Sequence, residues 1–219
     1  KPTVAGVLLF SEEPQAILPK RSAIKIYRYH TANEEGERDT LAFDPITIEG
    51  HIYLIIDAAK NRVKEIVESI QKLGPVGLED ISYPEEALQE IITNAVIHRD
   101  YSIPKDIHIR IFDNRIEVES PGRLPGHITL ENILDDQSAR NPKIIRLINK
   151  FPNPPNKDVG EGLKTAFEAM SKLRLKEPEI TETETFVLVT LRHESLASPE
   201  QMVTDYLDGH EEITNSIAR

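Results

Sequence analysis

The stretch from Tyr83 to Tyr101, YPEEALQEIITNAVIHRDY, places the strongest constraint on how this chain can fold. Pro84 suits the first turn of a helix, where its missing N–H group costs nothing. Apolar residues then recur at the spacing of one buried helical face: Leu88, Ile91, Ile92, Ala95 and Val96. Beside that face, Glu90, Asn94 and His98 follow one another four residues apart and form a polar stripe. Such a stripe belongs either to a functional site or to an ordinary helix flank.

Length and composition restrict the class of protein. The 219 residues can form one full domain with smaller pieces beside it, and the first residue, Lys1, leads us to expect an excised piece of a longer chain. The sequence has no apolar run long enough for a membrane span and no signal peptide. The absence of cysteine excludes disulfides and thiolate metal sites and favours a cytoplasmic protein. A net charge of −11 argues against a broad nucleic-acid-binding surface, so DNA contacts would be local or made by other parts.

The N-terminal third predicts a small α/β region followed by a long helix. Residues 3–10, TVAGVLLF, are consistent with a buried strand or a short helix, which periodicity does not separate. Residues 23–29, AIKIYRY, alternate well enough to predict a strand. Apolar residues at helical spacing continue from about residue 51 to residue 73, where a Gly-Pro pair stops them. We expect this helix to connect the N-terminal piece to the module that begins near Ile81.

The remainder of the chain predicts an α+β fold. The elements expected after the opening helix are strands at 107–111 and 115–119, a Pro/Gly turn at 120–126, helices behind Asn141-Pro142 and Gly162, and a strand at 185–191. The order helix, strand, strand, helix, helix, strand implies a mixed β-sheet with helices on one face. Residues 198–219 predict a helix, a glycine turn and the start of another helix.

Three elements with chemical potential follow one another in this order. The first is Glu90-x-x-x-Asn94, which puts an oxygen ligand for a hard cation beside a carboxylate that can act as a general base. The second is the turn at 120–126, directly after a strand. The third is Gly160-Glu161-Gly162-Leu163, whose glycines open a helix and offer free N–H groups to phosphate oxygens. Each element alone is weak evidence, whereas their order and spacing together are much stronger.

This order of motifs resembles the GHKL ATPase family, which includes gyrase B and the histidine kinases, and in which the elements are called the N-box, G1 box and G2 box. The likeness is closer to the ATPase module of Schlafen/Alba-like transcriptional regulators, which are described as ATP-dependent DNA helicase-related. The residues that carry it are EALQEIITNAVIHRDYS, IRIFDNRIEVESPGRLP, SARNPKIIRLI and VGEGLKTAFEAM. The resemblance implies a GHKL (Bergerat-fold) two-layer sandwich at 81–193, preceded by the C-terminal part of an Alba-like domain at 1–50 and a connecting helix at 51–80. It also implies the start of a winged helix at 194–219.

The resemblance also assigns roles to individual residues. Glu90 would be the general base that activates water, and Asn94 the Mg²⁺ ligand. The implied nucleotide contacts are Asn94, Ser120, Gly122, Arg123, Asn141, Lys157, Gly160, Gly162 and Leu163. Gyrase-like members carry an Asp before the G1 glycine that hydrogen-bonds the adenine amino group, whereas Ser120-Pro121-Gly122 stands here. Because Ser120 can accept only one such bond, we expect weaker adenine recognition.

The function implied by the resemblance is an ATP-binding module with slow, Mg²⁺-dependent hydrolysis, in which the loop 151–162 closes as a lid. The module would regulate a DNA-binding apparatus in transcription, and DNA would be bound through other domains. We expect no membrane partner, and a homodimer is compatible with this function. The alternative is a non-catalytic scaffold whose degenerate pocket serves dimerisation or partner docking. A histidine-kinase catalytic domain is a third option that lacks a phospho-acceptor helix. Helicase activity is not supported, since the sequence has no Walker A motif.

The histidines predict structural roles. His98 lies at the end of the predicted helix, where the dipole favours a structural hydrogen bond. The other histidines are scattered without metal-ligand spacing, so we predict no zinc site.

Overall fold

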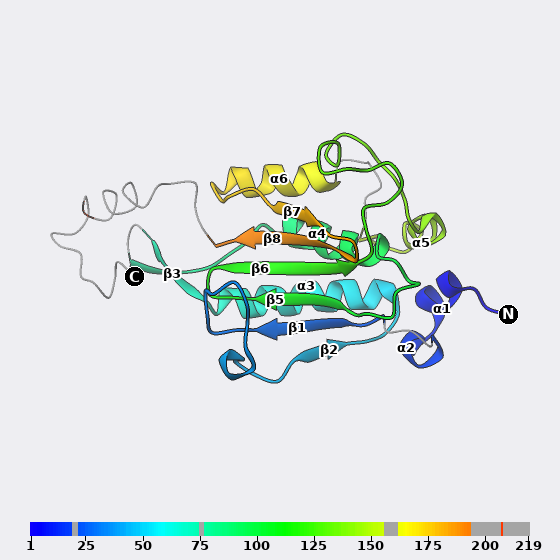
Figure 1. Ribbon diagram of the computed structural model, residues 1–219, viewed down its shortest axis with the longest axis horizontal. Helices are drawn as coiled ribbons and strands as arrows, with labels where there is room; N and C mark the ends of the chain where they lie inside the picture. Colours follow the sequence, from blue (N-terminus) through cyan, green and yellow to red (C-terminus); the bar gives the residue numbers. More distant parts are fainter. Residues whose placement is uncertain (19–21, 75–76, 156–161, 194–206, 208–219) are drawn as a thin grey trace.

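A mixed sheet of six strands forms the centre of the computed structural model, which describes residues 1–18, 22–74, 77–155, 162–193 and 207 (Figure 1). The strands of this sheet are β1 (Ile24–Arg28), β2 (Ile46–Ile48), β5 (Ile107–Ile111), β6 (Arg115–Pro121), β7 (Glu179–Glu182) and β8 (Phe186–Arg192). The α-helices are α1 (Val4–Phe10), α2 (Pro14–Ile17), α3 (Ile52–Glu68), α4 (Glu85–Ile97), α5 (Pro142–Ile148) and α6 (Gly162–Lys172). A 3₁₀ turn, η1 (Arg38–Thr40), and a separate hairpin of β3 (Gln71–Gly74) and β4 (Gly77–Asp80) complete the described elements.

The sheet has the strand order β2-β1-β5-β6-β8-β7. β1 runs parallel to β5, and the other neighbouring pairs are antiparallel. Helices α3 and α4 lie across one face of the sheet, and α6 packs against α4 (Figure 1). The predicted α+β class, a mixed sheet with helices on one face, is therefore confirmed.

The apolar core lies between the helices and the sheet. Every residue of the predicted apolar face of α4 is buried: Leu88, Ile91, Ile92, Ala95 and Val96. The facing strands alternate as a half-buried sheet must, so that Ile107, Ile109 and Ile111 of β5 are buried between less buried neighbours. None of the described helices is long and apolar enough to cross a membrane.

Two local predictions in the N-terminal third are resolved or corrected. Residues 4–10 form a helix, because the Thr3 Oγ1 atom caps it by accepting a hydrogen bond from the Gly6 N–H at 3.1 Å. The helix predicted to run to residue 73 ends at Glu68, and the β3–β4 hairpin follows. Ile70, directly before β3, is buried and therefore continues the apolar spacing of the helix, although it lies beyond its end. The spacing alone does not distinguish such a residue from one in a further helical turn.

The N-terminal strands belong to the same sheet as the rest. β1 and β2 lie within residues 1–50, the region that the resemblance assigns to an Alba-like domain, yet β1 pairs with β5 from Ile24↔Ile107 to Arg28↔Ile111. Alternation predicts a strand but not the sheet that it joins. The domain boundaries stay a prediction, and the predicted winged-helix start at 194–219 lies outside the described residues apart from Leu207. The edge strand β7 was not predicted from the sequence.

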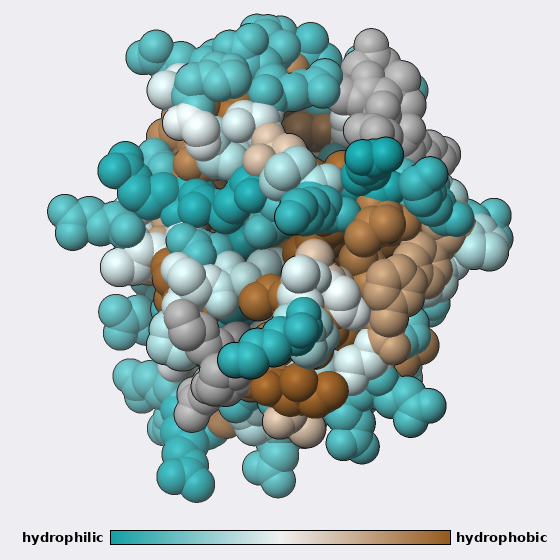
Figure 2. Space-filling model, turned by 90° about the vertical axis from the view of Figure 1, so that its right-hand side faces the viewer, coloured by the Kyte–Doolittle hydropathy of each residue, from teal (hydrophilic) through white to brown (hydrophobic). Residues whose placement is uncertain are grey.

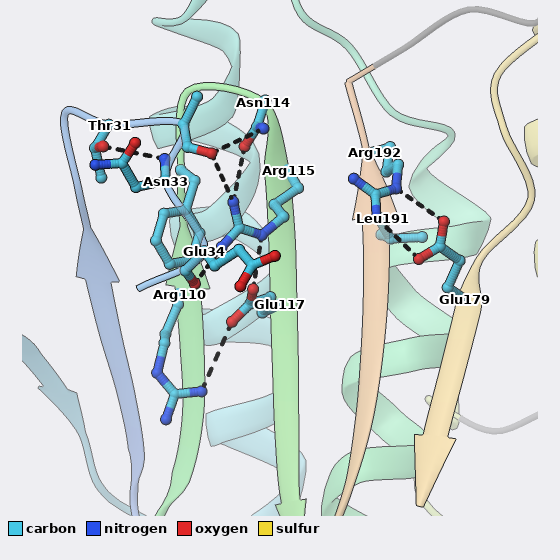
Figure 3. Close-up of polar contacts among 12 residues, drawn as sticks. Thr31, Asn33, Glu34, Arg110, Asn114, Arg115, Glu117, Glu179, Leu191 and Arg192 are labelled. Atoms are coloured by element: carbon cyan, nitrogen blue, oxygen red, sulfur yellow. Dashed lines mark hydrogen bonds and ion pairs between the residues drawn. The ribbon is translucent and has the colours of Figure 1, made fainter. Parts of the chain in front are cut away.

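A buried arginine ties a loop to the uncovered face of the sheet. The Arg115 guanidinium donates to the Glu117 carboxylate at 2.7 Å and to the Asn114 Oδ1 atom at 3.0 Å (Figure 3). It also donates to the backbone carbonyls of Ala32 and Glu34, at 3.4 and 2.8 Å. One side chain thus satisfies two backbone acceptors and holds the charged loop after β1 on the sheet.

A second charged cluster on this face is centred on Glu119. Its side chain is buried and accepts hydrogen bonds from Lys105 and, at 2.7 Å, from Arg110. Burial alone raises the pKa of Glu119, but the hydrogen bonds from Lys105 and Arg110 outweigh it and hold the pKa below its ordinary value. The carboxylate is therefore stabilised in its charged form.

We expect Glu119→Gln to lower the free energy of unfolding at pH 7 by about 1.5–3 kcal/mol, the range for a hydrogen bond to a charged group. Because the folded-state pKa of Glu119 is depressed, its contribution is present above the unfolded-state pKa of about 4.3 and is lost as pH falls through the folded value. Urea unfolding at pH 7 and at successively lower pH measures this difference. If the free energy of unfolding of the variant stays below that of the unaltered protein by the same amount down to pH 3, the depressed pKa of Glu119 is contradicted.

Candidate functional site

Glu90 and Asn94 lie one turn apart on α4, and their side chains form a hydrogen-bonded pair. The Asn94 Nδ2 atom donates to the Glu90 Oε1 atom at 2.8 Å. This bond orients the amide so that its Oδ1 oxygen is left to act as a ligand for a hard cation. Burial raises the pKa of the Glu90 carboxyl, and the hydrogen bond from Asn94 opposes only part of that rise. The pair therefore combines a metal-ligating oxygen with a carboxylate shifted towards the range of a general base.

Gly162, the first residue of α6, lies directly against the Glu90 carboxylate. A Cβ atom built at Gly162 would overlap both carboxylate oxygens and the Cδ atom of Glu90. Only glycine allows the backbone to come this close without displacing the carboxylate. The α6 N-terminus and the Glu90–Asn94 pair are therefore parts of one arrangement.

The turn after β6 requires glycine for a different reason. Gly122 has a φ of +104°, and a Cβ atom there would lie 2.7 Å from the Asp100 Cβ atom. The turn is fixed from both sides, because the Asp100 N–H donates to the Pro121 carbonyl at 2.7 Å and the Gly122 N–H to the Thr185 carbonyl at 2.8 Å. It therefore holds the end of β6 beside the end of α4.

Ser120 and Arg123 flank this glycine and already have partners. The Ser120 hydroxyl donates its proton to the Ala95 carbonyl at 2.7 Å. Towards a ligand, the Ser120 oxygen can therefore act only as a hydrogen-bond acceptor. The Arg123 guanidinium pairs with the Glu182 carboxylate at 3.3 Å. The same carboxylate accepts from the Leu124 N–H at 2.8 Å, so β7 supports the turn.

One cavity of about 420 Å³ joins these elements. Predicted site residues that line it are Glu90, Asn94, Ser120, Gly122, Arg123, Gly162 and Leu163. Its apolar floor comes from the helix-covered face of the sheet, where Val118 and Ile180 flank Val189 in register. The volume and the combination of an apolar floor with a few polar groups are typical of a small-molecule site.

Three predicted contacts are not placed in this cavity by the described structure. Asn141 does not line it, because its Nδ2 atom donates to the Ile97 and Arg99 carbonyls at 2.8 and 2.9 Å and caps the end of α4. Lys157 and Gly160 lie outside the described residues.

His98 differs from its predicted structural role. It lines the cavity, and its buried Nδ1 atom has no hydrogen-bond partner in the described part of the chain. Burial, with a smaller contribution from the charge of Arg140, lowers the pKa of His98 to about 4. The imidazole is therefore neutral at pH 7 and extends the polar stripe into the cavity.

The segment between the turn and α5 also lines the cavity and was missed in the sequence. It contributes Ile128, Ile133, Asp136, Gln137, Ser138 and Ala139. The signal was a short group of apolar residues, Ile128, Leu130, Ile133 and Leu134, in a polar stretch without a sustained helical or strand period. So few apolar residues, without a sustained period, identify neither a core nor a pocket.

The donor set suits Mg²⁺ bound together with phosphates. In the residues that the structure describes, no group of three or more His, Cys, Asp and Glu side chains could hold a metal ion by itself. Mg²⁺ is commonly held by one or two protein oxygens plus water and substrate phosphates. Asn94, supported by Glu90, fits that mode of binding.

Part of the chain matches a protein family. Residues 105–191 match the model of the family described as "Putative ATP-dependent DNA helicase recG C-terminal". The match includes the turn at Gly122 and the start of α6, but it begins after α4 and therefore does not contain Glu90 or Asn94. It supports an ATPase-like, nucleotide-binding module. The chain matches no curated protein.

Two solved structures resemble this one. The DIP2311 protein from Corynebacterium diphtheriae is 24% identical with a TM-score of 0.69, over 89% of this chain and 37% of that chain, so the two share a fold. The histidine kinase domain of the blue-light activated histidine kinase from Erythrobacter litoralis EL346 is 14% identical with a TM-score of 0.30, over 72% of this chain and 65% of that chain. A TM-score of 0.30 does not show a shared fold with the second structure. This chain spans less than two thirds of either protein chain.

We expect Gly162→Ala to displace the Glu90 carboxylate and to lower the free energy of unfolding by about 0.5–1.5 kcal/mol, because the displaced carboxylate loses its hydrogen bond from Asn94. A matched control is Gly6→Ala in α1, where a Cβ atom would meet only the Thr3 Oγ1 atom, at 3.3 Å. Chemical denaturation of both variants measures the difference, and a crystal structure shows whether the carboxylate has moved. If Gly162→Ala and Gly6→Ala change the free energy of unfolding equally, the close contact between Gly162 and Glu90 is contradicted.

Proposed function

We propose that this chain is an ATP-binding module that uses Mg²⁺ and hydrolyses ATP slowly. The observation that carries the proposal is that three elements far apart in sequence line one cavity: the Glu90–Asn94 pair, the Ser120–Gly122 turn and the start of α6 at Gly162. The family match over residues 105–191 supports the same class of ligand.

The apolar part of the cavity suits a nucleobase. Val118, Val189 and Ile180 offer a flat surface on the sheet, and Ile145 of α5 also lines the cavity. Since the Ser120 proton is donated to Ala95, the Ser120 oxygen can only accept from a ligand. An exocyclic amino group, as on adenine, is therefore a better partner than the carbonyl of guanine or hypoxanthine.

The polar part of the cavity suits a polyphosphate. The N–H groups at the start of α6, which is 11 residues long, and its dipole favour negative charge near Gly162. When bound, Mg²⁺ would neutralise part of the phosphate charge, with the Asn94 Oδ1 atom as its protein ligand. The Asn94 Nδ2 atom would hold Glu90 in place throughout.

Glu90 would supply the base for hydrolysis. Its carboxylate accepts a proton from water as the water oxygen bonds to the terminal phosphorus, and the bond from that phosphorus to the bridging oxygen breaks. The products are ADP and phosphate, and the proton leaves Glu90 to solvent. The raised pKa of Glu90 brings its basicity closer to neutral pH, which suits a general base.

The regulatory role is the wider part of the proposal. Because its net charge is −11, the module would affect DNA through other parts of a longer, cytoplasmic transcription regulator. Nucleotide binding would act there by favouring a homodimer. Residues 156–161, the middle of the predicted lid, lie outside the described residues.

A non-catalytic scaffold is the second candidate. The observation that favours it is Ser120, which replaces the expected carboxylate and already donates its proton to Ala95. A scaffold of this kind would hold nucleotide weakly and serve dimerisation or docking.

We expect calorimetric titration to show Mg²⁺-dependent ATP binding that Asn94→Ala weakens by about tenfold or more, because the metal loses its protein ligand. The control Asn61→Ala removes an exposed asparagine of α3 that donates to Asp57 at 3.2 Å, and it should bind ATP normally. Absence of binding to the unaltered protein would exclude the ATPase and favour the scaffold.

We expect Glu90→Gln to keep ATP binding and lower kcat by about 10²- to 10⁴-fold, the usual contribution of a general base. Glu86→Gln, an exposed position in the first turn of the same helix, is the matched control. Phosphate-release kinetics on both variants measure the effect, and an unchanged kcat in Glu90→Gln would remove Glu90 from the chemical step.

We expect Ser120→Ala to weaken ATP binding by about 2- to 10-fold, corresponding to one neutral hydrogen bond, and to leave binding of inosine triphosphate unchanged. Inosine triphosphate carries a carbonyl where ATP carries its amino group, so the ratio of the two affinities isolates this contact. A parallel loss for both nucleotides would show that Ser120 supports only the Ala95 carbonyl.

A further inference from the structure

A second cavity, of about 450 Å³, lies along α5 and is named the α5 cavity below. The residues that line it are Ala139, Pro142, Ile145, Arg146, Asn149 and Lys150. Ala139 and Ile145 also line the candidate nucleotide cavity, whereas the other four residues do not. The α5 cavity lies at the end of the molecule that carries α1, α2 and α5, where apolar and hydrophilic side chains lie side by side at the surface (Figure 2).

Two cationic side chains of the α5 cavity have no carboxylate partner. Within the described part of the chain, Arg146 and Lys150 form neither an ion pair nor a side-chain hydrogen bond. They are four residues apart, and the helical winding continues past the end of α5, since the Lys150 N–H donates to the Leu147 carbonyl at 3.0 Å. Like charges at this spacing repel each other, so a bound anion would stabilise both. By contrast, the two cations beside Glu119 on the sheet are neutralised by its carboxylate.

The Asn149 side chain adds an unsatisfied donor and an unsatisfied acceptor to the same place. Its Nδ2 and Oδ1 atoms are buried, and neither has a hydrogen-bond partner in the residues that the structure describes. The side chain is not needed to end α5, because the Asn149 backbone N–H donates to the Ile145 carbonyl at 3.2 Å. A buried amide without partners costs free energy, which a ligand that supplies a donor and an acceptor would recover.

These groups together suit a small phosphate ester that carries hydroxyl groups. Guanidinium and ammonium groups are common partners of phosphate oxygens. An amide can donate to one hydroxyl group and accept from another. Ala139, Pro142 and Ile145 form an apolar wall for the carbon atoms of such a ligand. The volume of the α5 cavity is in the range of small-molecule sites.

We propose that the α5 cavity is a second binding site, which takes a small hydroxylated phosphate ester of the sugar phosphate class. Arg146 and Lys150 hold the phosphate group, and Asn149 binds the hydroxyl groups. The site does not rest on the proposed function, because these three residues line only the α5 cavity.

The backbone of a nucleic acid has the same phosphate chemistry, but two observations favour a small molecule. The net charge of −11 opposes the approach of a polyanion much more than that of a single phosphate group. The third cation of α5, Lys143, is exposed and does not line the α5 cavity. A nucleic acid lying along α5 would use Lys143 as well, whereas a ligand confined to the cavity would not. Lys143 is therefore the matched control.

The experiment follows the backbone amide signals of Arg146, Asn149 and Lys150 by NMR in the nucleotide-free protein. Ribose 5-phosphate should shift these signals saturably, inorganic phosphate should bind more weakly, and ribose should have no effect. Arg146→Gln and Lys150→Gln should each weaken binding of ribose 5-phosphate by about tenfold or more, because a charge-assisted contact is lost. Lys143→Gln should leave the affinity unchanged.

Asn149→Ala tests the amide separately. It should weaken ribose 5-phosphate by about 2- to 10-fold and leave inorganic phosphate unchanged, because the amide meets only the hydroxyl groups. Urea unfolding should show no loss of stability in this variant, since the amide has no partner to lose. An equal loss of affinity for both probes would contradict the role of Asn149.

Three results would overturn the proposed site. The first is the absence of saturable shifts at Arg146, Asn149 and Lys150 with ribose 5-phosphate. The second is unchanged affinity in Arg146→Gln and Lys150→Gln, with reduced stability in urea, which would leave these cations a role in the helix alone. The third is tighter binding of a short DNA duplex that Lys143→Gln weakens as much as Arg146→Gln does. Shifts confined to Gly162 would report the candidate nucleotide cavity instead, so the two sites are tested independently.

Discussion

The burial of one face of α4 between the sheet and the neighbouring helices is the constraint on which the rest of the structure depends. Leu88, Ile91 and Ile92 commit the helix to a single rotation about its axis, because any other rotation would expose them. That rotation fixes the direction of Glu90 and Asn94, which then form the edge of a cavity instead of a solvated flank. α6 can approach α4 closely at this edge only because Gly162 has no side chain.

The two ends of the cavity differ in how firmly they define a ligand. Around Glu90 and Asn94, a hydrogen-bonded pair, a helix N-terminus and a close glycine all favour phosphate and a hard cation. At the other end, Ser120 offers one acceptor and apolar residues offer surface. For the proposed nucleotide, the phosphate end would therefore be supported by three features, whereas the base would depend on one neutral hydrogen bond and on shape.

The charged clusters on the uncovered face of the sheet serve the fold, not the cavity. Arg115 satisfies the carbonyls of the loop after β1, and Glu119 is neutralised by Lys105 and Arg110 (Figure 3 shows the Arg115 cluster). Because adjacent residues of a strand point to opposite faces, Val118 lines the cavity while Glu119 lies on the other side. The sheet thereby separates the structural ion pairs from the candidate site.

The sequence by itself determined α4, its buried face and the polar stripe, because a helical period places residues four apart on one side without help from the rest of the chain. It also determined the strands of the central hairpin, since their alternation and the turn between them are local features. Only the tertiary structure decided that β1 joins the same sheet as β5, that α3 gives way to a hairpin after Glu68, that Asn141 caps α4 and that residues 128–139 line the cavity. Each of these depends on contacts between residues distant in sequence, for which the local pattern carries no information about the partner.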